Sequence, residues 1–366
     1  MRYAEDDIGE AARRCGLRRG DPAAPGITRV RRGRGYSFHD PRGRTLTDPD
    51  EIRRCKELAI PPAWRDVWIC PSADGHLQAV GTDEAGRRQY IYHREWQRIR
   101  EETKYDRMLD FAERLPDIRG AVAAHLQRGG LARERVLAAA VRLVDLGLFR
   151  AGNRAYAEEH DTYGVASLLR EHVRRRRGLL VFSYPAKGGK HRTVELAEPD
   201  VERLIAVLQR RRRPGETLLA YRDGGDWREI RSEDVNDYLR EISGEDFTVK
   251  DFRTWHASVL AAVGLAVATQ PATPTARRRL AAHVTGEVAA YLGNTTAVAR
   301  ASYIDPRVFR LFDQGVTVAS ALPGLGRDTD FGELATQGAV EKAVLKMLRT
   351  HPEHCDPAEA ADGGPG

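Results

Sequence analysis

The stretch LGNTTAVARASY ends on Tyr303, the best candidate nucleophile that we find in this chain. A helix should stop at its start, because Gly293 permits a sharp backbone turn. A short helical run follows and ends at the tyrosine, shortly before Pro306 breaks the element. A tyrosine hydroxyl can attack a phosphate ester and form a covalent intermediate. A tyrosine at a helix end is more often a packing residue, however, so its role depends on its neighbours.

Four residues upstream of Tyr303 complete a catalytic set, in the chain order Arg150, Lys187, Arg253 and Asn294. They lie in the segments LFRAGNRAYAEEHDTYG, PAKGGK, VKDFRTWH and LGNTTAVARASY. The set resembles that of the type IB DNA topoisomerases, in the short poxvirus-like form found in bacteria. That family has Arg, Lys, Arg, His or Asn, and Tyr in this order, and the spacing from Asn294 to Tyr303 matches. Poxviral members have histidine where this chain has Asn294, and bacterial members resemble this chain in having asparagine.

The two arginines suit phosphoryl transfer. Transesterification of a phosphodiester places extra negative charge on the non-bridging oxygens, and a planar guanidinium donates two hydrogen bonds to such oxygens. We expect Arg150 and Arg253 to do this, while Asn294 adds one uncharged hydrogen bond. The alternative for either arginine is a surface ion pair. Arg253 stands at the start of an apolar helix, where a purely structural arginine is less expected.

The leaving sugar oxygen needs a proton, and Lys187 is the candidate general acid. It lies in a loop between two expected strands, and nearby arginines would lower the pKa of its ammonium toward neutrality. Most loops of this kind are ordinary exposed turns. Lys190 is a rival in the same glycine-rich loop. The family pattern, an aromatic strand followed by Gly-Lys, favours Lys187, although Ala186 replaces that glycine.

We find no acidic cluster with the spacing of a metal pair, so we predict neither a metal nor a cofactor. Covalent catalysis through Tyr303 fits a mechanism that uses no metal ion. The resemblance implies that Tyr303 forms a 3′-phosphotyrosyl bond and releases a 5′-hydroxyl. It further implies that the duplex rotates about the intact strand before the hydroxyl reseals the nick. The expected activity is relaxation of supercoiled DNA without ATP.

Residues Gln89, Tyr90 and Tyr92 are expected to contact DNA. Alternate residues of a strand share a face, so the two tyrosines lie together, directly after Arg87-Arg88. The alternative is that the two tyrosines only pack in the core beside a sheet. The resemblance supports the contact, because PPAW and LQAVGTDEAGRRQYIYH look like the β-rich clamp of the family. Tyr156, which follows Arg150, is a further candidate.

The elements that must position these residues predict an α+β protein. A flexible arm (1–26) precedes a β-rich DNA-clamp domain (27–93), a mainly helical catalytic domain (94–350) and a disordered tail (351–366). In the clamp domain, Thr47 or Asp48 should cap a short helix. The catalytic domain should resemble the tyrosine recombinases, with a small hairpin in residues 179–198. Its expected helices are residues 94–113, 117–127, 132–148, 165–174, 200–212, 232–242, 252–268, 276–291 and 330–349.

Composition and charge fit a DNA-binding protein. The chain has 366 residues and a net charge of +6, and its arginines form runs at 174–177, 210–213 and 277–279. Such runs favour a polyanion, and we expect a monomer that clamps double-stranded DNA. Four scattered cysteines (Cys15, Cys55, Cys70 and Cys355) argue for a reducing compartment, the cytoplasm. Within the cytoplasm we expect the protein at the nucleoid. We find neither a signal peptide nor a membrane span.

Two other functions use similar residues. A tyrosine recombinase shares the Arg, Lys, Arg, Tyr order, but its second arginine box usually reads His-x-x-Arg, and here Lys250 holds the histidine position. Its N-terminal partner would be a helical bundle, whereas residues 27–92 read as strands. A non-catalytic DNA-binding protein would give Arg150, Lys187, Arg253 and Tyr303 no reason to occur together. The topoisomerase is therefore the prediction.

Overall fold

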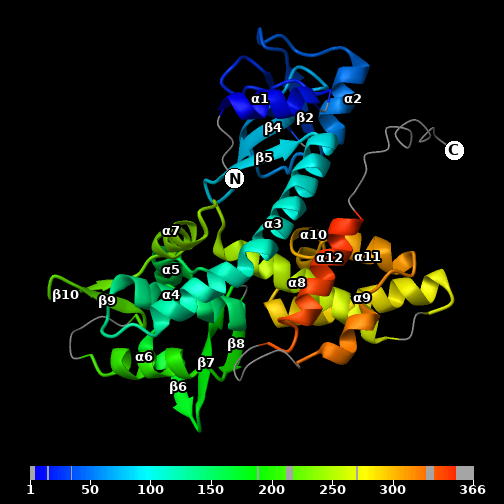
Figure 1. The fold of residues 1–366 in the computed structure, drawn as a ribbon. Coiled ribbons are helices and arrows are strands. Elements are labelled where there is room, and N and C mark those ends of the chain that lie inside the picture. Colours follow the sequence, from blue (N-terminus) through cyan, green and yellow to red (C-terminus); the bar gives the residue numbers. More distant parts are fainter. Residues whose placement is uncertain are drawn as a thin grey trace. The chain divides into compact units, whose positions relative to one another are not determined.

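The structure is a computed structural model that describes residues 5–14, 16–33, 35–187, 189–211, 217–268, 271–326 and 334–351. It has two compact units, Met1–Lys104 and Tyr105–Gly366 (Figure 1). Residues 352–366 of the expected tail lie outside the described part. Helices combine with small antiparallel sheets, which agrees with the predicted α+β class.

The first unit is built on a five-stranded antiparallel sheet with the order β2-β1-β3-β4-β5. Its strands are β1 (Ile27–Arg32), β2 (Gly35–His39), β3 (Arg65–Ile69), β4 (Leu77–Thr82) and β5 (Arg88–Tyr92). Helix α2 (Pro49–Glu57) contributes the buried Cys55 to the core beneath the sheet, which includes Ile27, Phe38 and Ile69. The cap of α2 is Asp48, whose carboxylate accepts the amide of Asp50 at 2.9 Å. All five strands lie within residues 27–92, which the sequence predicts to form strands.

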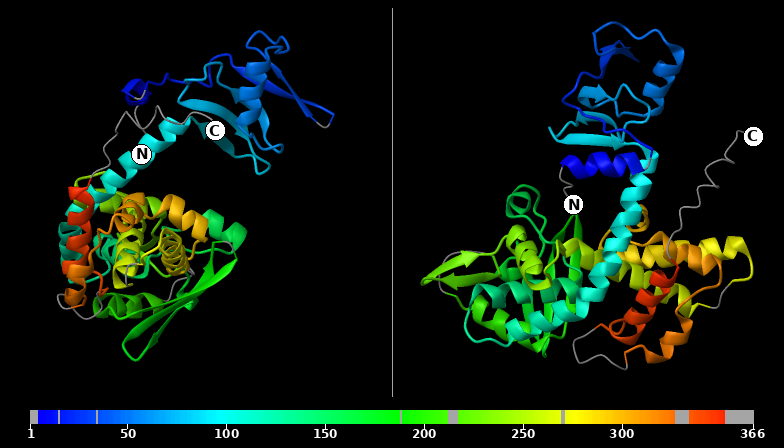
Figure 2. Two further views of the ribbon diagram at one scale, coloured as in Figure 1. Left: turned by 90° about the vertical axis from the view of Figure 1, so that its right-hand side faces the viewer. Right: turned by 45° about the horizontal axis from the view of Figure 1, so that its top comes forward.

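Helix α1 (Glu5–Arg14) occupies part of the segment for which we expected a mobile arm. Ile8 and Ala12 are one turn apart and therefore share a face of the helix. That face packs with Leu17 against Trp96, near the start of helix α3 (Arg94–Leu126), and both views in Figure 2 place α1 beside it. The many charged residues of the segment concealed this short apolar stripe.

The second unit contains most of α3 and nine further helices among the described residues. These are α4 (Arg133–Gly147), α5 (Arg154–His160), α6 (Pro199–Gln209), α7 (Ser232–Ser243), α8 (Val249–Val267), α9 (Pro274–Leu292), α10 (Thr296–Ser302), α11 (Pro306–Asp313) and α12 (Ala339–Thr350). Helix α8 is the centre of the unit, because α4, α7, α9, α11 and α12 all pack against it. Two small sheets complete the unit: β6 (Val173–Arg176), β7 (Leu179–Ala186) and β8 (Lys190–Leu196) in that order, and β9 (Ala220–Asp223) with β10 (Asp226–Glu229).

Two helix predictions were wrong. The two helices expected at 94–113 and 117–127 form the single helix α3, which continues through Pro116. This proline lies on the exposed face, while Leu115 and Ile118 keep the buried face continuous. Residues 165–174 form no α-helix but a short 3₁₀ turn followed by β6, because Val173 pairs with Phe182 of β7. Tertiary strand pairing here overrides local helical preference.

Among the residues that the structure describes, no helix is both long enough and apolar enough to cross a bilayer.

Candidate active site

Tyr303 is held at the end of α10 by its own amide and by contacts of the two residues that follow it. It caps the helix, with its own amide donating to the Ala299 carbonyl at 3.1 Å. The next carbonyl, of Ile304, accepts the hydroxyl proton of Tyr105 at 2.9 Å. The amide of Asp305 donates to Ser258 Oγ on α8 at 3.0 Å. The predicted helix end at the tyrosine is confirmed, and the tyrosine backbone is fixed to α3 and α8.

Arg253 lies against the ring of Tyr303. Its Cζ is 5.2 Å from the centre of that ring, and the side chain is almost fully buried. The guanidinium donates to the Leu148 carbonyl after α4 and, at 2.9 Å, to the Leu292 carbonyl at the end of α9. Its Nε is buried without a partner among the described residues. Burial and the neighbouring Arg150 lower the pKa of Arg253 to about 10, so it remains a cation at neutral pH.

Arg150 and Asn294 form the second half of the cluster. The guanidinium of Arg150 donates to Asn294 Oδ1. Asn294 follows Gly293, which ends α9 in the left-handed conformation (φ 65°), and it is 8% exposed. Its Nδ2 is buried without a partner among the described residues, so the amide keeps a donor available for a ligand.

Two glycines fix the chain after Arg150. The Arg150 carbonyl accepts the Val165 amide at 2.8 Å, which brings Gly164 against Gly152. A Cβ atom on Gly164 would lie only 2.5 Å from the Gly152 amide nitrogen. Any larger residue at Gly164 would therefore push these segments apart and move Arg150.

The environment of Tyr303 favours its phenolate. Burial by itself raises the pKa of the hydroxyl, but the charges of Arg253 and Arg150 outweigh it, and the pKa lies below its usual value. Lys250, one turn before Arg253 on α8, lowers this pKa further. In the sequence we noted Lys250 only as the residue in place of a recombinase histidine. A nucleophilic tyrosine gains from such neighbours, since its anion is the attacking species.

The β7–β8 hairpin carries both candidate lysines. Lys187 follows β7 and is exposed, and the structure gives it no hydrogen bond or ion pair with another described residue. Lys190 opens β8, and its Nζ donates to the Asn294 carbonyl at 3.4 Å. Four of the five expected catalytic residues thus lie together, and Lys187 lies outside that cluster. The choice between the two lysines stays a prediction.

Arg192 is a residue of this cluster that no sequence pattern identifies. Its guanidinium donates to the carbonyls of Gly147, Leu148 and Tyr291, at 2.8, 3.1 and 3.2 Å. It therefore shares the Leu148 carbonyl with Arg253 and ties the hairpin to the ends of α4 and α9. Its backbone partners are distant in the chain, so no local pattern identifies it.

The expected DNA contacts lie in both units. Tyr90 and Tyr92 of β5 are stacked, with ring centroids 6.2 Å apart, and Tyr90 is 47% exposed. The side-chain amide of Gln89 donates from Nε2 to the Asp83 carboxylate at 2.9 Å. Tyr156 belongs to α5, but its side chain lies outside the described part of the chain. The two tyrosines of β5 therefore share a face, as the alternation predicts.

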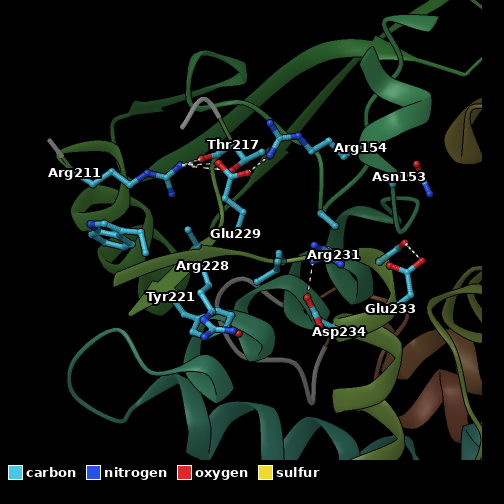
Figure 3. Close-up of a pocket in the computed structure, with 16 residues that line it drawn as sticks. Asn153, Arg154, Arg211, Thr217, Tyr221, Arg228, Glu229, Arg231, Glu233 and Asp234 are labelled. Atoms are coloured by element: carbon cyan, nitrogen blue, oxygen red, sulfur yellow. Dashed lines mark hydrogen bonds and ion pairs between the residues drawn. The ribbon is translucent and has the colours of Figure 1, made fainter. Parts of the chain in front are cut away.

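A cavity of about 800 Å³ in the second unit does not contain the cluster. Figure 3 shows its wall, where Arg154 and Arg211 point toward Glu229 from two sides. Acidic residues at the start of α7, Glu233 and Asp234, also line it. Positively and negatively charged side chains are nearly equal in number in this lining, so the cavity is not an obvious phosphate-binding site. Among the described residues, no group of three or more His, Cys, Asp or Glu is placed to hold a metal ion.

A buried ion network supports α8 behind the cluster. Asp145 of α4 accepts from Arg119 Nε and His256 Nε2, both at 2.8 Å. Arg119 also pairs with Glu341 of α12, at 2.7 Å. Burial alone would raise the pKa of Asp145, but Arg119 and His256 outweigh it and hold that pKa well below its usual value. The network joins α3, α4, α8 and α12 next to Arg253.

Replacing Asp145 with Asn is expected to lower the free energy of unfolding at pH 7 by about 3–5 kcal/mol, because it removes the buried anion on which Arg119 and His256 converge. A depressed pKa stabilises the fold above the unfolded pKa of about 3.9, and this contribution declines as the pH falls toward the folded pKa. Denaturant unfolding from pH 7 to 3 should therefore show the difference shrinking below about pH 4. The control Asp117→Asn removes an exposed ion pair and should change stability by less than about 0.5 kcal/mol. Equal effects of the two substitutions would contradict this account.

Comparison with known proteins decides the family. A model of the catalytic core of eukaryotic DNA topoisomerase I matches residues 93–318, and a model of the N-terminal domain of bacterial DNA topoisomerase IB matches residues 35–83. The chain belongs to the type IB DNA topoisomerases. The predicted enzyme class is confirmed: this isomerase acts on DNA, and its family implies a double-stranded substrate.

Two curated relatives agree with this assignment. DNA topoisomerase 1B of Acanthamoeba polyphaga mimivirus is 28% identical over 287 residues, which cover 76% of this topoisomerase and 85% of the relative. DNA topoisomerase 1 of Drosophila melanogaster is 28% identical over 170 residues, which cover 44% of this chain and 16% of the fly protein. The core match, residues 93–318, contains Arg150, Lys187, Arg253, Asn294 and Tyr303.

Proposed function

We propose that this topoisomerase relaxes supercoiled DNA by cutting one strand through a covalent bond to Tyr303. The Tyr303 oxygen attacks the scissile phosphorus, a 3′-phosphotyrosyl bond forms, and the bond from phosphorus to the 5′ oxygen breaks. Lys187 gives its proton to that oxygen. Rotation about the intact strand follows, and the 5′-hydroxyl then attacks the phosphotyrosine, returns a proton to Lys187 and releases Tyr303.

The observation that carries this proposal is the packing of Arg253 against Tyr303, beside the pair of Arg150 and Asn294. Two cations near one buried tyrosine favour its phenolate and can also bind the phosphate oxygens that gain charge. Arg253 Nε and Asn294 Nδ2 have no partner among the described residues, and they supply further hydrogen bonds to those oxygens. A structural tyrosine would not require this concentration of donors.

The finer features of the prediction belong to the same proposal. Residues 27–93 act as a DNA-clamp domain, in which Gln89, Tyr90 and Tyr92 contact the duplex, and residues 94–350 form a catalytic domain like that of the tyrosine recombinases. Tyr156 makes a further contact from α5. The enzyme works as a monomer around DNA, at the nucleoid in the cytoplasm. Stacked, partly exposed tyrosines on β5 support the first of these contacts.

Relaxation of a negatively supercoiled plasmid is expected to continue in excess EDTA and without ATP. Tyr303 serves as nucleophile and cationic side chains stabilise the charge, so no step of the proposed reaction uses a metal ion. Agarose gels of plasmid topoisomers, with and without added Mg²⁺, give the measurement. Magnesium can accelerate turnover by easing product release, but an absolute requirement for it would contradict the mechanism.

A further inference from the structure

Arg192 lies on β8, five residues after Lys187, and its guanidinium contacts the ends of two helices. It donates to the carbonyls of Gly147 and Leu148 at the end of α4, and to that of Tyr291 at the end of α9. The last carbonyls of a helix have no partner within the helix and carry the negative end of its dipole. A single cation that donates to both ends therefore holds α4, α9 and β8 together.

Each segment that Arg192 joins carries one residue of the proposed catalytic set. Arg150 comes shortly after the α4 carbonyls, and Asn294 comes three residues after the α9 carbonyl. Lys187 lies in the same hairpin as Arg192. The Cζ of Arg192 is also 5.8 Å from the centre of the ring of Phe149, the residue before Arg150. Arg192 therefore links the hairpin of the proposed proton donor to the residues proposed to bind the phosphate.

The position of Arg192 in the hairpin divides an anchored base from an exposed tip. Arg192 pairs across the strands with Tyr184, which is buried, as is Phe182 before it. Beyond this pair, residues 185–187 and 189–191 are partly or fully exposed. From this tip, Lys190 Nζ donates to the Asn294 carbonyl at 3.4 Å, which is long for a hydrogen bond. The shorter bonds of Arg192 thus do more to fix the direction of the tip.

The helix ends depend less on Arg192 than the hairpin does. Arg253 also donates to the Leu148 carbonyl and, at 2.9 Å, to the Leu292 carbonyl. The ends of α4 and α9 would therefore keep a shared cation if Arg192 were lost. The tip of the hairpin would lose its three bonds to these helices.

We propose that Arg192 is a positioning residue, which holds the β7–β8 hairpin so that Lys187 can deliver its proton to the 5′ oxygen. Its guanidinium stays on the helix carbonyls throughout and touches neither the DNA nor the reacting atoms. The inference rests on the proposed function, since it takes Lys187 as the proton donor. A displacement of about 1 Å can cost on the order of 10²-fold in rate, so a loosened hairpin transfers the proton slowly.

The test compares single-turnover cleavage of two duplexes by Arg192→Met, one with oxygen and one with sulfur at the 5′-bridging position. Methionine keeps much of the side-chain length but donates no hydrogen bond. Cleavage of the oxygen duplex should slow by roughly 10- to 100-fold. The sulfur leaving group needs no proton, so the sulfur duplex should lose little rate. The ratio of the sulfur rate to the oxygen rate should therefore rise by about the same factor.

A merely structural role predicts a different result. If the loss of Arg192 displaced Arg150 or Asn294, both duplexes would be cleaved more slowly and the ratio of their rates would not change. An unchanged ratio, or an unchanged rate with the oxygen duplex, would overturn the inference.

Arg203→Met is the matched control. Arg203 is an exposed arginine of α6 in the same unit and pairs with Asp200, so the change in net charge is the same. Both rates should equal those of the unsubstituted enzyme. Arg192→Lys keeps the charge, but one ammonium cannot replace all three bonds, so the ratio should rise less than in Arg192→Met. Thermal unfolding verifies each fold. If Arg192→Met unfolds, Arg192→Lys takes its place, and an unchanged ratio counts against the inference in the same way.

The Lys187→Ala variant separates this inference from the proposed function. Adding Arg192→Met to it should slow cleavage of the oxygen duplex little further, because no proton donor remains to be positioned. Two fully additive losses would overturn the inference. Rescue of Lys187→Ala by sulfur, together with an unchanged ratio in Arg192→Met, removes only the role of Arg192. If sulfur does not rescue Lys187→Ala, the proton-transfer step of the proposed function itself is wrong.

Discussion

The Tyr303→Phe variant is expected to form no covalent DNA adduct and to relax no plasmid. The substitution removes a single hydroxyl, the proposed nucleophile, while the phenyl ring can keep its contact with Arg253. Duplex affinity should stay close to that of the unsubstituted enzyme, with the same salt dependence, because most affinity comes from phosphate contacts. Denaturing gels, plasmid relaxation and anisotropy binding measure the three quantities.

A structural tyrosine would behave differently. Loss of a buried hydroxyl typically costs about 1 kcal/mol of stability and leaves activity mostly intact. Tyr291→Phe is a suitable control, because Tyr291 is a partly exposed tyrosine at the end of α9, outside the proposed catalytic set. It should keep relaxation activity. Relaxation by Tyr303→Phe at a normal rate would end the nucleophile proposal.

Replacement of Lys187 by Ala is expected to slow strand cleavage by roughly 10²- to 10⁴-fold, the usual contribution of general acid catalysis. A duplex with sulfur at the 5′-bridging position has a leaving group that needs no proton. This substrate should therefore restore most of the lost rate. Single-turnover cleavage of the oxygen and sulfur substrates, followed on denaturing gels, gives the two rates.

Lys190→Ala is the matched control in the same hairpin. Lys190 donates to the Asn294 carbonyl, so its loss should have a much smaller effect, which the sulfur substrate does not reverse. If the sulfur substrate rescues Lys190→Ala instead, the proton donor is Lys190. The assignment from the Gly-Lys pattern would then be wrong, because the family's lysine would correspond to Lys190 and not to Lys187.

Local sequence signals predicted the parts of this molecule that depend on neighbouring residues. Alternating strands identified the sheet of the first unit, and Asp48 with Pro49 marked the start of α2. The end of α10 at Tyr303 followed from the proline placed shortly after it, Pro306, although helix α11, which begins at that proline, was not predicted. Each of these depends on turn chemistry or capping within a few residues.

Contacts between distant residues were not predictable. Arg253 is held by carbonyls 105 and 39 residues away in the chain, and backbone carbonyls leave no mark on the sequence. The pairing of Arg119 with Asp145 and Glu341 likewise joins three helices that no periodicity connects. Helix α3 continues through Pro116 because the apolar residues on either side of the proline keep one face of the helix buried. Tertiary packing thus determined what the local pattern left open.

The most direct test of the proposal identifies the residue that carries the DNA. A nicked suicide duplex traps the covalent complex, and trypsin then releases the peptide ASYIDPR, residues 301–307, which contains Tyr303. Mass spectrometry should find this peptide joined through the tyrosine oxygen to the 3′-phosphate of the cleaved strand. DNA attached to any other residue, or attached through its 5′ end, would contradict the mechanism.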